Sequence, residues 1–181
     1  NIFVVFTCNV LQKKVKEEIK MKKFLVMTCV GITLFITIPV FAQEADAILG
    51  KWYTEGAEAS VEIFKCGNAY CAKIFALKEP MYNANSPAVK DGKAKVGEAK
   101  RDTENPDSSQ SSKPIIGMTF AKNFKWEAGD KEWQDGEIYK ASNGKLYKGF
   151  MKLENPDRLL VKGHLKISKW IGAKQFWTRI K

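Results

Sequence analysis

Histidine is almost absent from this chain, since His164 is the only one among 181 residues. A single imidazole argues against a His-activated nucleophile, which needs a base held beside it. The sequence also lacks a Gly-rich phosphate loop, Cys and His residues at zinc-ligand spacing, and a Gly-x-Ser-x-Gly turn. Arginine is not clustered, and no nucleic-acid-binding motif is present. We therefore expect no catalytic residue, no metal, no cofactor and no nucleic acid partner.

The first 42 residues resemble an export signal behind an upstream extension. A basic start at Met21 leads into an apolar run, and the small residue Ala42 stands where signal peptidase would cut. Residues 16–20 can be encoded by a purine-rich sequence of the kind found at ribosome-binding sites. We therefore expect translation to begin at Met21 and residues 1–20 to lie upstream of the protein. An uncleaved anchor is the alternative, although three threonines and a proline interrupt the run. We predict a signal peptide at 21–42, which is the chain's only membrane contact and is lost on cleavage, and a periplasmic or secreted domain at 43–181.

The predicted mature part contains 139 residues, because 181 minus 42 is 139. This length suits one domain with a single core. The leader holds six Lys and two acidic residues, which leaves 24 basic and 18 acidic residues and a net charge of +6. These charges are dispersed, so they indicate either a solvated basic surface or attraction to an anionic envelope. The sequence predicts no oligomeric state.

Two cysteines, Cys66 and Cys71, remain after cleavage. Alternating strand-like segments flank them, and Gly67-Asn68 between them tolerates the positive φ of a tight turn. We predict a disulfide across the end of this hairpin, stabilising the domain by about 2 kcal/mol. Metal binding is the alternative, but it requires further thiol or imidazole ligands that the mature sequence does not offer.

Short strand-like segments separated by turn signals run through the mature chain and predict an all-β barrel or sandwich of about eight strands. Residues 78–113 interrupt the pattern with prolines and charges and predict a long loop, which is typical of a lid or a disordered insertion. The strand pattern resumes at 115–120. Near the C-terminus, alternation places Val161 and Leu165 on one face of a strand and His164 on the other.

Six short motifs occur in a fixed order and together resemble a known bacterial exported family, domain of unknown function 2147. The resemblance covers nearly all of 48–181 and implies an antiparallel calycin-like barrel similar to lipocalins and fatty-acid-binding proteins. The chain departs from the family pattern at Ala72-Lys73, where Gly-Arg is usual, and at Gly163-His164, where Gly-Tyr is usual. The motifs are Gly50-x-Trp52, Cys66-Gly67 with Cys71, Asn105-Pro106-Asp107, Trp133-x-x-Gly136-x-Ile138-Tyr139, Asn143-Gly144-Lys145-x-Tyr147 and Gln175-x-Trp177-x-Arg179.

Trp52 and Arg179 lie in the first and last strands of the implied barrel. Closing a barrel brings these strands together, so we predict that the Arg179 guanidinium stacks on the Trp52 ring and plugs the closed end. Such a cation–π contact is worth roughly 0.5–2 kcal/mol. The alternative is an exposed arginine near the chain terminus.

The first functional hypothesis is a binding module whose barrel holds a small apolar or amphipathic molecule beneath the long loop. A completely filled barrel without a cavity is equally compatible with the sequence. Strand alternation selects the candidate lining residues Ile63, Phe75, Tyr139, Tyr147, Met151, Val161 and Leu165.

The second hypothesis is an envelope glycan-interacting protein or hydrolase that uses carboxylates of the long loop. Its candidate loop site contains Asp102, Asn105 and Asp107, which are also typical turn and cap residues. Aromatic residues for stacking on sugars would be Trp126, Trp133, Phe150 and Trp170.

Overall fold

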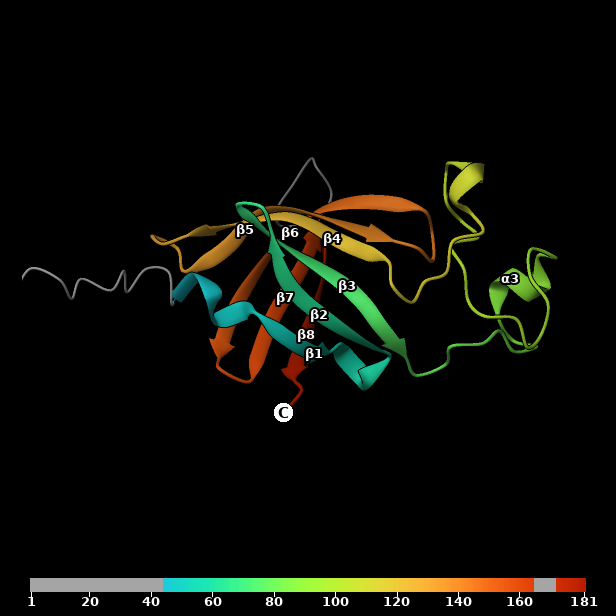
Figure 1. Cartoon of the computed structure of the whole chain (residues 1–181), viewed down its shortest axis with the longest axis horizontal. Helices are drawn as coiled ribbons and strands as arrows, with labels where there is room; N and C mark the ends of the chain where they lie inside the picture. The colour runs from blue at the N-terminus through green and yellow to red at the C-terminus, as the bar shows by residue number, and fades with distance from the viewer. Residues whose placement is uncertain (1–43, 165–171) are drawn as a thin grey trace, which may run out of the picture. The chain divides into compact units, whose positions relative to one another are not determined.

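The computed structural model describes residues 44–164 and 172–181 (Figure 1). The predicted extension and signal peptide, Leu165 and Trp170 lie outside the described residues. Within the described ranges, no helix is long and apolar enough to cross a membrane.

A closed antiparallel barrel is formed by the eight strands of the described chain, each paired with the next (Figure 1). The last strand pairs with the first through Trp52 opposite Arg179 and Tyr53 opposite Thr178, which closes the barrel. The all-β barrel expected from the sequence is therefore confirmed. The strands are β1 Gly50–Tyr53, β2 Ala59–Cys66, β3 Ala69–Leu77, β4 Thr119–Glu127, β5 Glu132–Lys140, β6 Lys145–Asn155, β7 Arg158–His164 and β8 Gly172–Arg179.

The β2–β3 hairpin carries the predicted disulfide between Cys66 and Cys71, whose Cα atoms are 5.9 Å apart. Gly67 turns this hairpin with a φ of +67°, in the left-handed region that favours glycine. The turn and the covalent link lie at the end of the barrel where β1 begins, because Gly50 pairs with Ile63 near the end of β2.

Large side chains fill the barrel toward this end. Trp52, Phe124 and Leu159 are completely buried, and Trp133 and Met151 are 1% exposed. A 3-10 turn, η1 Asp46–Ile48, packs Ile48 into the same cluster. The Trp52 indole donates to the Ile48 carbonyl at 3.0 Å, and the Trp133 indole donates to the Ala45 carbonyl at 3.1 Å. This half of the barrel is a packed core of buried side chains.

Residues 78–118 connect β3 to β4 at the opposite end of the barrel (Figure 1). The segment contains α3 Pro87–Lys90 and η3 Ser108–Gln110, and it has a small apolar cluster of Tyr82, Ala88 and Ala94. The long loop predicted at 78–113 is thus an ordered segment with its own hydrogen bonds.

Two local expectations are corrected by the structure. The strand predicted to resume at 115 begins at Thr119, because the Ile115 N–H bonds to the Lys100 carbonyl within the connecting segment at 3.0 Å. His164, predicted on a polar outer face, is only 7% exposed. It lies at the end of β7, where simple alternation is a poor guide to burial.

Candidate functional site

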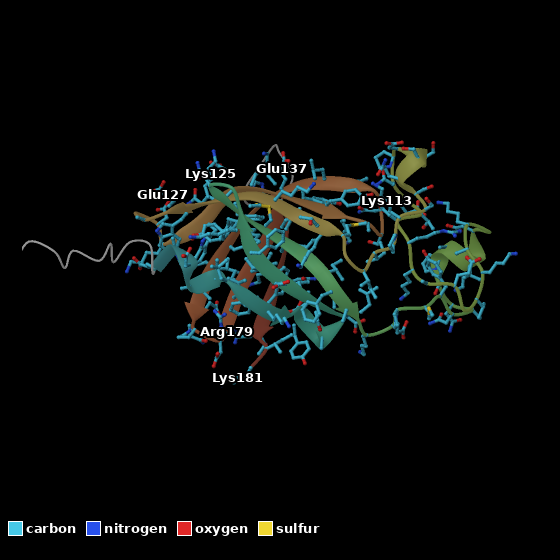
Figure 2. All side chains as sticks on the ribbon, viewed as in Figure 1. Lys113, Lys125, Glu127, Glu137, Arg179 and Lys181 are labelled. Carbon is cyan, nitrogen blue, oxygen red and sulfur yellow. A yellow bond between two sulfur atoms is a disulfide. The ribbon has the colours of Figure 1, made fainter. Side chains whose placement is uncertain are left out.

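Arg179 seals the packed end of the barrel. Its guanidinium carbon lies 4.1 Å from the centroid of the Trp52 ring, which is the stacking that the sequence predicts. The guanidinium nitrogens also donate to the carbonyls of Ala47, Leu49 and Pro156 at 2.7–2.8 Å. Burial lowers the pKa of the guanidinium, although nearby Asp157 opposes that shift. Figure 2 shows Arg179 close to the C-terminal Lys181, away from residues 78–118.

The other end of the barrel contains a cavity of about 520 Å³. Val161 and Trp177, both nearly buried, line it together with Ile138 of β5. Gly163 and Ala173, which pair across β7 and β8, contribute almost no side-chain volume to its wall. The volume lies within the range of small-molecule sites, roughly 300–1,000 Å³. The remaining lining residues are Phe120, Tyr139, Lys140, Tyr147, Gly172 and Gln175.

This cavity brings together three of the residues predicted to line a pocket, namely Tyr139, Tyr147 and Val161. Two others, Ile63 and Met151, are interior residues of the packed core instead. Leu165 lies outside the described residues. Sequence reasoning missed the small residues Gly163 and Ala173; their position on facing strands was the signal that the barrel has space there.

The placement of Phe75 in the interior is wrong. The interior positions of β3 include Tyr70 and Ala72 in the core, with Ile74 packed against it. Because side chains alternate, Phe75 points outward, where the Lys51 ammonium lies 5.2 Å from its ring centroid.

A second, larger hollow of about 910 Å³ lies between residues 102–118 and strands β4–β6. It has Phe120 and Tyr139 in common with the barrel cavity, so the two spaces adjoin at these residues. The rest of its wall consists of Asp102, Asn105, Gln110, Lys113, Pro114, Ile116, Gly117, Met118, Thr119, Lys122, Glu137 and Leu146.

Asp102 ties the connecting segment to the barrel. It is 1% exposed, and its carboxylate accepts hydrogen bonds from the Tyr139 hydroxyl at 2.9 Å and from the Asn105 amide at 2.6 Å. Burial and the bond to Asp102 raise the pKa of Tyr139 to about 12. Both Asp102 oxygens have partners, so this carboxylate links the turn at Asn105 to strand β5.

The other loop candidates serve the same turn. Asn105 accepts from the Asp107 N–H at 2.9 Å, and Asp107 caps η3 by accepting from the Ser109 N–H at 3.0 Å. Hydrogen bonds from Ser109 hold the pKa of Asp107 below its usual value. The three loop residues are therefore brought together, in a network of turn and cap contacts.

The aromatic residues proposed for sugar stacking do not form one surface. Trp133 is buried, with its ring 4.5 Å from that of Trp126, and Phe150 lies on the barrel wall with the Lys162 ammonium 6.0 Å from its ring. Trp170 is outside the described residues. In the same described ranges, no three His, Cys, Asp or Glu side chains come together as metal ligands.

A closed eight-stranded antiparallel barrel, sealed at one end and hollow at the other, defines a lipocalin-like protein. A family model described as an uncharacterized protein conserved in bacteria (DUF2147) matches residues 50–179, and the chain belongs to this family. A solved structure of HP1028 from Helicobacter pylori, described as belonging to the lipocalin family, superposes with a TM-score of 0.58 at 18% identity. The match covers 74% of this chain and 83% of HP1028. No curated protein matches the sequence.

Proposed function

We propose that the protein is an exported binder of a small apolar or amphipathic molecule, which it holds in the cavity between β5 and β8. The observation that carries this proposal is the contrast inside one barrel. Trp52, Phe124 and Trp133 fill the sealed half, whereas glycine and alanine leave about 520 Å³ open toward the mouth.

The chemistry of the cavity wall favours an apolar ligand. Ile138, Val161 and Trp177 supply hydrocarbon and aromatic surface, and each buried CH₂ group of a ligand contributes about 0.8 kcal/mol. Gln175 and the hydroxyls of Tyr139 and Tyr147 offer a few polar contacts. The predicted signal peptide at 21–42 supports action outside the cytoplasm, where the hairpin disulfide would form readily.

Gly163 offers a direct way to close the cavity. A Cβ at this position would lie 3.8 Å from Ile138 Cδ1 and from Tyr147 Cβ, an ordinary contact, so a side chain can enter without hitting the backbone. We expect Gly163→Leu to fill the space and to reduce binding of the neutral fluorophore N-phenyl-1-naphthylamine about tenfold or more.

Lys162→Leu is the matched control, because it adds the same side chain at the next position, whose side chain is associated with Phe150 on the outer wall. It should bind the fluorophore like the wild type, and circular dichroism should show both variants folded. Equal binding by Gly163→Leu and the wild type would place the fluorophore elsewhere and remove the support for this cavity.

A further inference from the structure

The hollow between residues 102–118 and the barrel is an extension of the proposed binding site. Apolar side chains reach solvent there: Ile116 is 42% exposed and Leu146 is 49% exposed. Phe120 and Tyr139 line both this hollow and the barrel cavity. A molecule that passes these two rings would therefore contact the cavity with one part and the hollow with another.

Two lysines and two carboxylates, Asp102 and Glu137, line the hollow. Lys113 and Lys122 both line it and are exposed, and within the described part of the chain neither side chain forms an ion pair or a hydrogen bond. Figure 2 shows Lys113 in the connecting segment beside the barrel. Lys122 belongs to β4, where it pairs in register with Glu137 of β5, and it lines the hollow as well.

The acidic groups of the hollow already have partners. Glu137 pairs with Lys148 at 3.1 Å, and Asp102 accepts from Tyr139 and Asn105. Asp107, which does not line the hollow, accepts a hydrogen bond from the Ser109 hydroxyl at 2.7 Å. Its interaction with Lys113 is a weaker, longer-range electrostatic one. The two lysines therefore remain as the groups available to an incoming anion.

We infer that the ligand is an anionic amphiphile, with its hydrocarbon chain in the barrel cavity and its carboxylate or phosphate head between Lys113 and Lys122. This inference rests on the proposed function and adds the chemical class of the ligand. The ammonium groups attract the head, and burial of the chain past Phe120 and Tyr139 supplies most of the affinity.

The test compares dodecanoate with dodecan-1-ol, which have the same chain and differ in the charge of the head. Each displaces N-phenyl-1-naphthylamine from the full mature protein, and the readout is the ratio of their dissociation constants. Because exposed ion pairs are weak, we expect Lys113→Gln/Lys122→Gln to shift this ratio against dodecanoate by about five- to tenfold. Raising the salt to about 0.5 M should shrink the difference in the wild type.

Lys125→Gln is the matched control, since Lys125 is an exposed lysine of the same strand that lines neither space and carries the same change of charge. Its ratio should equal that of the wild type. An equal shift in Lys125→Gln would show a general charge effect and overturn the inference. A shift confined to Lys140→Gln, at the cavity rim, would also overturn it by placing the head elsewhere.

If the wild type binds neither molecule, the proposed function fails. If it binds both and no variant changes the ratio of dissociation constants, only the head site fails.

Discussion

Arg179 joins the last strand to the start of the domain through its ring contact with Trp52 and through hydrogen bonds to three carbonyls. The side chain thus holds the η1 turn against the barrel end. A hydrogen bond from a charged donor contributes about 1.5–3 kcal/mol, and a cation–π contact contributes roughly 0.5–2 kcal/mol.

We expect Arg179→Ala to lower the free energy of unfolding by about 2–3 kcal/mol, measured by urea denaturation. Arg179→Lys should recover less than half of this loss, because one ammonium cannot reach three carbonyls and cover the Trp52 ring as well. In a double-mutant cycle with Trp52→Leu, the coupling should be about 1 kcal/mol. Additive effects would show that the contact contributes nothing.

Ionisation of Tyr139 should lower the free energy of unfolding at alkaline pH. Its pKa in the folded protein, about 12, is above the value near 10 of an unfolded tyrosine, because burial and Asp102 favour the neutral hydroxyl. The stabilisation is therefore fully present below pH 10 and is lost as the pH rises through 12.

We expect the wild type to lose more stability between pH 10 and 12 than Tyr139→Phe, which has no hydroxyl to ionise. The absorbance of tyrosinate near 295 nm, followed against pH, should lack one group titrating near pH 12 in the variant. Identical titration curves for the two proteins would contradict the buried hydrogen bond to Asp102.

The β5–β6 turn packs closely against the connecting segment. Gly144 has a φ of +64°, and a Cβ there would overlap the main-chain carbonyl of Glu104. Gly67, in the β2–β3 turn, has nearly the same φ of +67°, but nothing lies within 4 Å of its Cβ position. The segment packs on the Gly144 turn and not on the Gly67 turn, which is closed instead by the disulfide between Cys66 and Cys71.

We expect Gly67→Ala to cost about 1 kcal/mol, from left-handed backbone strain alone. Gly144→Ala should cost about 1–2 kcal/mol more and should speed proteolytic cleavage within 78–118, because the segment must move away from the turn. Thermal unfolding and timed digestion measure these effects. Equal losses in the two variants, with unchanged cleavage, would mean that the segment is not held by this turn.

Regular strands were predictable because their alternation is clean. Val161 and Tyr147 were assigned to the interior by period alone. In β3 it was harder to predict which alternate residues face the interior, because the small Ala72 lies inside and the large Phe75 lies outside. Irregular backbone at Asn123 and Asp135, with φ of +62° and +59°, also breaks the alternation of β4 and β5, and the sequence gives little sign of it.

For the molecule as a whole, the strand pattern predicted a barrel or a sandwich, and the family resemblance implied the barrel. Its closure by Trp52 and Arg179 followed, because the first and last strands of a barrel must meet. The cavity was not predictable in the same way. It depends on how the volumes of Trp177, Gly163 and Ala173 add up across neighbouring strands, and that sum follows from register. The ordered fold of 78–118 depends equally on contacts that are distant in sequence, such as Asp102 with Tyr139.

Native mass spectrometry of residues 43–181, the predicted mature protein, purified from the envelope where we propose that it acts, tests whether the barrel carries a ligand. The wild type should show an added mass that denaturation releases, and Gly163→Leu, folded and purified in parallel, should lack it. The bare protein mass in both samples, or the same added mass in both, would contradict binding in the cavity between β5 and β8.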